Sequence, residues 1–245
     1  MPTYSSYKPV RSHAKPPKDM STLRMAILPL LILFCIFPPI GFARYAWNAS
    51  QVSIVTSAAK NGDLAKLKAM VKADKQYAEA KGYLGRTPLW WATARGRTEV
   101  ITYLVKDAKV DIDVKDSRGW TPLFAAAAHN QKDALETLVD LGANRSLTDT
   151  AGGTALHAAA TGYNPATAEV LTNIGLSVDA ADAKGMTPLH IAIQHKNGNM
   201  VKTLIGLQAN VNAKAKDGTT PLAMANRQHR GQDIASDLID AGAKE

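Results

Sequence analysis

Two patterns of hydrophobic residues follow one another along the chain. After Ser50, short apolar clusters alternate with polar residues at the spacing of helices that bury one face, as in Val100, Ile101, Leu104 and again Leu135, Leu138. Before it, Met25–Ala43 is a run of nineteen uncharged residues, eleven of which are Leu, Ile or Phe, and it has no polar face. The sequence therefore predicts an all-α fold with one apolar helix followed by many short amphipathic helices.

The amphipathic part is a tandem repeat. The string Thr-Pro-Leu, or Thr-Ala-Leu in one unit, begins at five positions that are 34, 33, 33 and 33 residues apart: Thr87, Thr121, Thr154, Thr187 and Thr220. Each string is followed by a second helical pattern, and two units then end in Leu-x-Ala-Asn, at residues 141–144 and 207–210. An earlier unit, from Ser53, keeps the helical pattern without Thr-Pro. This pattern resembles the ankyrin repeat family and implies an ankyrin-repeat solenoid of helix–turn–helix units that binds proteins.

The chemistry of the unit agrees with that resemblance. A threonine oxygen can cap a helix, and proline at the first helical position loses no hydrogen bond. The Asp-x-x-Gly sequence before the threonine, as in residues 116–119, is typical of a tight turn. We expect the third unit, with Ala155 in place of proline and Gly162–Pro165 in its turn, to be a weak point or a local bend. We expect the last helix to present a polar outer surface.

The N-terminal segment predicts a membrane helix. Five Lys or Arg residues precede Met25–Ala43 within twenty residues, whereas only Arg44 and Lys60 follow it within twenty. The positive-inside rule therefore places the N-terminus in the cytoplasm and the repeats on the other side, which is the periplasm in a Gram-negative host. The alternative is a signal peptide cleaved after Ala43. The predicted organisation is a disordered basic tail (1–24), the membrane segment (25–43), a linker (44–50) and the ankyrin domain (51–245), with units near 51–83, 84–116, 117–149, 150–182, 183–215 and 216–245.

Charge and composition exclude several kinds of protein. The net charge is +8, but residues 1–43 supply +4 of it, and the other +4 is spread over 202 residues, which is weak for a nucleic-acid-binding domain. One cysteine excludes an internal disulfide and a cysteine-based zinc site. No nucleotide-binding loop or catalytic motif is present, so we expect neither an enzyme nor a cofactor or metal. His157 and His190 follow Thr-x-Leu, where the ring usually bonds neighbouring backbone.

Aligning the units on their threonines predicts the partner-binding surface. Turn tips and the ends of first helices fall on one concave strip, which combines aromatic, methionine and basic residues of the kinds enriched at protein interfaces. The strip consists of Tyr83, Leu84, Arg86, Arg95, Arg118, Trp120, His129, Lys184, Met186, Gln194, His195, Lys216, Arg227 and Gln228. Because the strip is basic, we expect an acidic protein partner and salt-sensitive binding. The alternative for Trp120 is that it only covers the neighbouring tip.

The sequence therefore favours a membrane-anchored ankyrin-repeat binding module or scaffold, exposed on the non-cytoplasmic side. One alternative is an accessory structural subunit of a larger membrane protein complex. Another is a secreted periplasmic ankyrin protein, if the N-terminal segment is cleaved.

Overall fold

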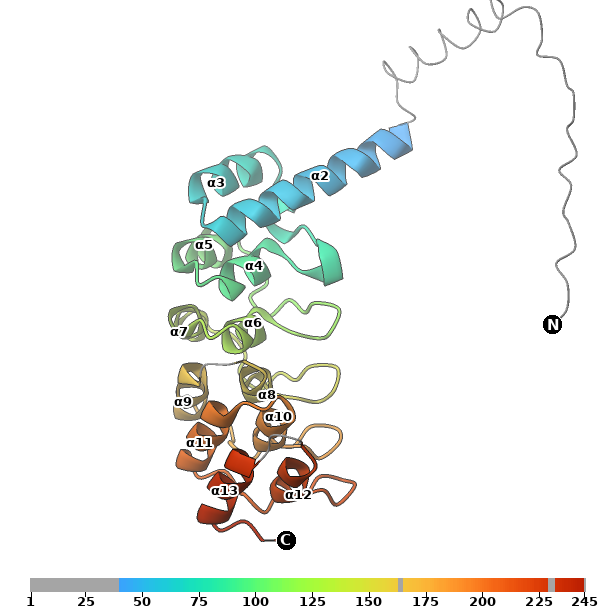
Figure 1. The fold of residues 1–245 in the computed structure, drawn as a ribbon. Helices are drawn as coiled ribbons and strands as arrows, with labels where there is room; N and C mark the ends of the chain where they lie inside the picture. Colours follow the sequence, from blue (N-terminus) through green and yellow to red (C-terminus); the bar gives the residue numbers. More distant parts are fainter. Residues whose placement is uncertain (1–39, 163–164, 229–231, 245) are drawn as a thin grey trace, which may run out of the picture. The chain divides into compact units, whose positions relative to one another are not determined.

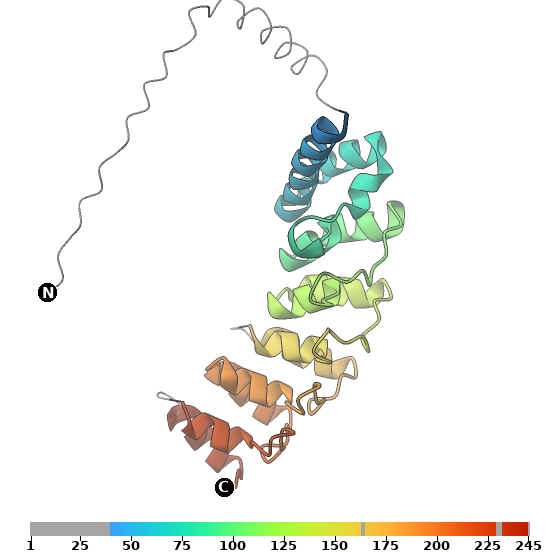
Figure 2. The same cartoon turned by 90° about the vertical axis from the view of Figure 1, so that its right-hand side faces the viewer.

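Pairs of short helices stack in sequence order, and each pair contributes one helix to each of two rows (Figures 1 and 2). The computed structural model describes residues 40–162, 165–228 and 232–244, with side chains from Ala49 onward except Gln232. The chain divides into two units, Met1–Asn48 and Ala49–Glu245. The second unit contains the repeats, and every regular element in its described part is helical.

The first row contains the helices that begin at or directly after the repeated threonines: α4 (Pro88–Ala94), α6 (Pro122–Ala128), α8 (Ala155–Ala160), α10 (Pro188–Gln194) and α12 (Pro221–Asn226). The second row contains α5 (Thr98–Thr102) with its wider continuation η3 (Tyr103–Asp107), α7 (Lys132–Asp140), α9 (Ala166–Asn173), α11 (Gly198–Gly206) and α13 (Gln232–Asp240). The first pair is α2 (Ile40–Asn61) and α3 (Leu64–Ala73), followed by the single turns η1 (Lys75–Glu79) and η2 (Tyr83–Gly85). Within each row a helix contacts its counterparts in the next repeats, as expected for a solenoid.

The N-terminal part differs from the expectation in one respect. Residues 44–50, predicted as a linker, belong to helix α2, which continues into the first repeat as far as Asn61. Of the predicted membrane segment, residues 25–39 lie outside the described residues, as does the predicted tail 1–24. Among the helices that the structure describes, none is both long and apolar enough to span a membrane.

Leucines at the repeat spacing form the core. One set lies in the first row and is at most 3% exposed: Leu89, Leu123, Leu156, Leu189 and Leu222. A second set lies in the second row and is fully buried: Leu104, Leu138, Leu171, Leu204 and Leu238. Burying each leucine contributes about 1.5–3 kcal/mol. The predicted core positions in α5 and α7 are therefore confirmed.

Threonine and histidine side chains define where the first-row helices begin. The hydroxyl of Thr87 accepts a hydrogen bond from the Trp90 amide at 3.3 Å, and Thr220 does the same for Ala223 at 3.2 Å. Helix α8 has alanine in place of proline at its first position and still begins directly after the repeated threonine. The amide at this position has no acceptor within the helix, so either residue is tolerated there. Residues 163–164 of the turn after α8 lie outside the described residues, so the weak point expected there remains a prediction.

His157 and His190 connect each helix start to the next repeat. Their Nδ1 atoms accept hydrogen bonds from the amides of Thr154 and Thr187, both at 3.1 Å. Because Nδ1 accepts, the proton lies on Nε2, which donates to the carbonyl of Met186 (3.0 Å) or Thr219 (3.2 Å) one repeat later. The structural role expected for these two histidines is confirmed.

The last repeat has a mixed outer surface. Asp233, Ser236 and Asp240 of α13 are exposed, which agrees with the polar cap expected there. Ile239 lies among them with 57% of its surface exposed, so the cap is less polar than expected.

We predict that the free energy of unfolding falls as the pH drops below about 6.5. Burial lowers the pKa of His157 and of His190 below the ordinary value of 6.5, so the unfolded chain takes up protons first. Their contribution to stability is complete above pH 6.5 and is lost as the pH falls toward the folded-state pKa values. The loss amounts to about 1.4 kcal/mol for each pKa unit by which one histidine is lowered. Urea unfolding followed by circular dichroism between about pH 7.5 and 5.5 measures it.

The double variant H157Q/H190Q tests the assignment to these two residues. Glutamine at the third helical position can still accept the threonine amide but does not titrate, so the pH dependence should become shallower. The variant H195Q changes an exposed histidine at the end of α10 and should keep the dependence of the parent protein. An unchanged dependence in the double variant would show that other groups cause it.

Candidate functional site

The turn tips of successive repeats are joined by backbone hydrogen bonds. The amide of Ser117 donates to the carbonyl of Leu84 at 2.9 Å, and Thr150 donates to Arg118 at 3.1 Å. Two further bonds, from Ala183 to Ala151 and from Lys216 to Lys184, continue the series at 2.9 Å. We call this series the tip ladder. It places one tip beside the next, so side chains from different repeats share one surface.

Aspartates and glycines give the tips their conformation. The Oδ1 atom of Asp116 accepts hydrogen bonds from the amides of Arg118 (2.8 Å) and Trp120 (3.0 Å), and Asp149 and Asp182 make the equivalent bonds in the next two tips. Gly119 has a positive φ of 78°, and a Cβ there would lie 2.8 Å from the Thr150 amide nitrogen. Glycine is therefore required both by the backbone conformation and by the close approach of the next tip.

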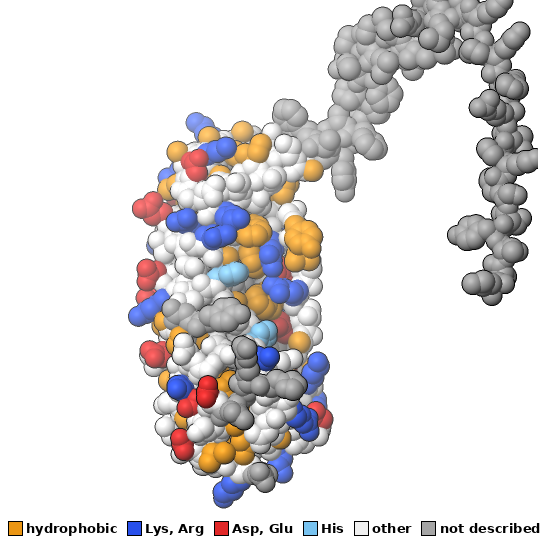
Figure 3. All heavy atoms as spheres, in the orientation of Figure 1, with side chains coloured by type: hydrophobic (Ala, Val, Ile, Leu, Met, Phe, Trp, Pro, Cys, Tyr) orange, Lys and Arg blue, Asp and Glu red, His pale blue; other side chains and the backbone are white. Residues whose placement is uncertain are grey.

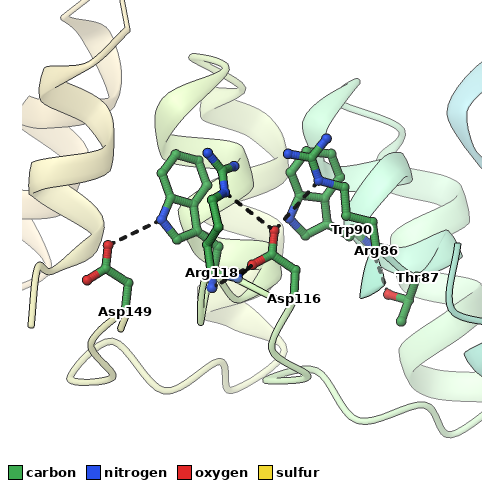
Figure 4. Close-up of polar contacts among 7 residues, drawn as sticks. Arg86, Thr87, Trp90, Asp116, Arg118 and Asp149 are labelled. Atoms are coloured by element: carbon green, nitrogen blue, oxygen red, sulfur yellow. Dashed lines mark hydrogen bonds and ion pairs between the residues drawn. The ribbon is translucent and has the colours of Figure 1, made fainter. Parts of the chain in front are cut away.

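Two arginine–tryptophan stacks share one carboxylate (Figure 4). The guanidinium carbon of Arg86 lies 3.9 Å from the ring centroid of Trp90, and that of Arg118 lies 3.9 Å from the ring centroid of Trp120. Between them the Oδ2 atom of Asp116 lies 3.6 Å from Nε of Arg86 and 4.0 Å from Nε of Arg118. The Asp116 carboxylate is almost completely buried, whereas the Arg118 side chain is 46% exposed. The tips thus hold one exposed cation, Arg118, and one largely buried cation, Arg86, whose side chain is 16% exposed.

Trp120 has a structural role as well as a place on the strip. Its indole nitrogen donates to Oδ2 of Asp149 in the next tip at 3.3 Å. Its ring is partly buried against the core, 6.2 Å from the ring of Phe124. These contacts support the alternative that Trp120 covers the neighbouring tip, and its exposed part also supports the stacked Arg118.

More positive charge gathers beside this cluster, at the ends of α4 and α6. His129 ends α6 in an exposed position, with its ring 5.9 Å from that of Trp90. Desolvation lowers the pKa of His129, and three nearby cations lower it further. These cations are Arg86, Arg95 and Arg118, so charges from two repeats act on one imidazole. Figure 3 shows hydrophobic, basic and histidine side chains adjoining on one face at the level of these helices.

Two residues of this surface were missed at the sequence level. Lys60, at the end of α2, has its Nζ atom 5.2 Å from the ring centroid of Trp91, which is partly buried. The unit that contains Lys60 lacks Thr-Pro, so alignment on the threonines could not place it. The adjacent positions of Trp90 and Trp91 predict one ring in the core and the other near the groove, without showing which; Trp90, 2% exposed, belongs to the core.

At the other end of the strip, the tips at 183–186 and 215–219 border a hollow of about 350 Å³. Lys184, Met186 and Lys216 line it as members of the predicted strip, and Met224 of α12 joins them. Met224 was not predicted, because it lies inside a first helix where the repeat pattern favours core residues. The hollow therefore combines apolar methionine surface with lysine charge.

The remaining residues of the predicted strip differ in their exposure and in their hydrogen bonds to the fold. Tyr83 is 80% exposed, and Arg95, Gln194, His195 and Arg227 are exposed as well. Leu84 is half-buried with a positive φ of 57° and contributes its carbonyl to the tip ladder. Gln228 is also half-buried, and its amide donates to the carbonyl of Ile193 at 2.8 Å, so it is held by the fold.

The repeats identify the class of protein. The family model described as ankyrin repeats (3 copies) matches residues 55–149 and 141–215, which is more than half of the chain. The chain therefore belongs to the ankyrin-repeat family, whose repeats mediate protein–protein interaction.

Several curated proteins are similar over part of their length. The 26S proteasome non-ATPase regulatory subunit 10 of Dictyostelium discoideum is 33% identical over 85 residues, which are 35% of this chain and 37% of that protein. Protein phosphatase 1 regulatory subunit 12A of Mus musculus is 46% identical over 56 residues, 23% of this chain and 5% of that protein. The probable E3 ubiquitin-protein ligase XBOS32 of Oryza sativa subsp. japonica is 30% identical over 109 residues, 42% of this chain and 22% of that protein. The matched region thus spans at most 37% of the length of these relatives.

Proposed function

We propose that this chain is a protein-binding module, and not an enzyme, whose partner docks on the strip of tips and first-helix ends. The observation that carries the proposal is the tip ladder with the cations stacked beside it. The ladder brings Arg86 and Arg118 from different repeats onto one surface, although neighbouring tips keep the same turn without such arginines. Exposed arginine and aromatic side chains held in fixed positions lose little entropy when a partner binds.

The relatives support a role within an assembly. Two of the three proteins compared above have names that describe regulatory subunits, one of the proteasome and one of a phosphatase. We propose a comparable role for this chain, as the part of an assembly that holds another protein. The identity of that protein does not follow from the shared repeats, because partners are recognised by side chains that differ between repeat proteins.

We further propose that the N-terminal segment tethers the module to a membrane, with the repeats on the non-cytoplasmic side. The apolar run Met25–Ala43 and the excess of basic residues before it support this proposal. If the segment is instead cleaved after Ala43, the repeats are secreted in soluble form.

Site-specific photo-crosslinking tests the docking surface. We expect a benzoylphenylalanine placed at Tyr83 or at Met186 to crosslink the same protein partner in cells, because both positions lie on the strip. The matched control is Glu136, which is exposed on α7 in the second row. Crosslinks from Glu136 but not from the strip would place the partner on the opposite row of helices and contradict the proposal.

A reporter fused to the C-terminal end of this chain tests the location. We expect a reporter that is active only outside the cytoplasm to give a signal, because five basic residues precede the apolar segment and two follow it. The control is a variant in which Arg44 is followed by four inserted lysines, which should reverse the orientation and abolish the signal. A silent reporter on the parent chain would contradict the proposed side, and a mature N-terminus at Arg44 would show cleavage.

A further inference from the structure

Resting on the proposed function, we infer that Arg86 and Arg118 form a clamp for the carboxylates of an acidic segment in the partner protein. The two arginines come from successive tips, and the guanidinium carbon of each lies over a tryptophan ring, 3.9 Å from its centroid. Stacking fixes the planes of the guanidinium groups before a partner arrives. A fixed guanidinium fork can bind a carboxylate through two parallel hydrogen bonds.

The donors of both arginines are available. Each guanidinium turns its Nε toward Asp116, at 3.6 and 4.0 Å, and neither distance corresponds to a normal hydrogen bond. The structure shows no hydrogen bond from the terminal guanidinium nitrogens of Arg86 or Arg118 to any residue it describes. These terminal nitrogens can therefore donate to a ligand without breaking an existing bond, and a ligand reaches Arg118, 46% exposed, more easily than Arg86, 16% exposed.

The charges at this place are unbalanced. Lys60 and Arg95 lie near the two stacks, which themselves contain Arg86 and Arg118, whereas the carboxylates that contact the stacks are those of Asp116 and Asp149. Burial first and then the nearby Arg118 lower the pKa of Arg86, so the two guanidinium groups repel one another. A ligand carboxylate bound to their terminal nitrogens, on the side away from Asp116, would reduce that repulsion.

The shape of the turn does not require the pair, although the two arginines also offset the charge of Asp116, whose Oδ2 is buried without a hydrogen bond. The next tip keeps the same turn around Asp149, with hydrogen bonds of 2.9 Å from Ala151 and Gly153 and no arginine at the equivalent positions. The tip after it does so around Asp182, with Lys184 exposed. The same turn and the same ladder bonds therefore form in later tips that have no arginine at these positions.

The surface fits an acidic protein segment better than a nucleic acid or a lipid headgroup. The cations gather within neighbouring repeats, and residues 44–245 carry a net charge of only +4, whereas a phosphate backbone requires an extended basic stripe. Tyr83, 80% exposed beside Arg86, offers an aromatic surface to an apolar residue between the partner's carboxylates.

Fluorescence anisotropy with a labelled peptide tests the clamp on the full chain in mild detergent. The probe is the peptide Glu-Asp-Glu-Phe-Glu-Asp-Glu, and its control is the amide analogue Gln-Asn-Gln-Phe-Gln-Asn-Gln. We expect the acidic peptide to bind at least about ten-fold more tightly than the amide peptide. The variant R86Q/R118Q should bind the acidic peptide about ten-fold or more weakly than the parent chain. The variant R86K/R118K should show most of the same loss of affinity, because lysine keeps the charge but lacks the guanidinium fork.

A matched variant separates the clamp from general charge attraction. K72Q/K106Q removes the same charge from two exposed lysines of α3 and η3 that lie outside the strip, and it should change the affinity less than about three-fold. An equal loss in both glutamine variants would overturn the clamp, and so would equal binding of the two peptides. Binding of polyuridylate that is tighter than that of the acidic peptide, and that R86Q/R118Q weakens, would also overturn it.

Two further measurements keep the outcomes distinct. Circular dichroism shows whether each variant folds. If R86Q/R118Q does not fold, the clamp is tested by comparing the two peptides on the parent chain and by the affinity of R86K/R118K. Crosslinking from Tyr83 tests the proposed function separately. A partner crosslinked there together with no binding of the acidic peptide would overturn the clamp and leave the protein-binding role standing.

Discussion

Each helix pair in this domain depends on its neighbours to bury its apolar side chains. A unit of about thirty-three residues cannot form a core by itself, so the leucines of each row must pack against those of the adjacent repeats. Packing at this spacing also brings neighbouring tips close enough to form the backbone hydrogen bonds of the tip ladder. Glycine occurs where the backbone of one tip closely approaches the next. The contacts that stabilise the fold therefore also determine how the side chains of neighbouring tips are positioned relative to one another.

This dependence explains how a scaffold without a catalytic motif acquires a specific surface. Helix starts, tips and core leucines repeat, and the side chains that differ between tips are the ones free to recognise a partner. In the second and third pairs those side chains are stacked arginines around Asp116, and in the fifth and sixth they are methionine and lysine around a hollow. The strip thus carries two chemically different regions on one regular backbone.

The fold could be predicted closely because its signals are local and repeated. Thr-Pro-Leu marks helix starts, and the periodic leucines mark the core, as Leu138 shows. Residues 44–50, expected as a linker, belong to helix α2, which the sequence does not indicate because the repeat pattern begins only after Ser50. The site was predicted only in part. The strip follows from the repeat alignment, but the contribution of Lys60, the bond from Trp120 to Asp149 and the carboxylate shared by two arginines depend on contacts between repeats.

Hydrogen exchange at the ladder amides tests most directly whether the tips form one continuous surface that binds a partner. These amides belong to Ser117, Thr150, Ala183 and Lys216. In the free full chain the account predicts slow exchange at all four, because each is held by the preceding tip. With the acidic peptide present, it predicts further slowing confined to the first two. Fast exchange in the free chain, or slowing in the second-row helices instead of the tips, would contradict it.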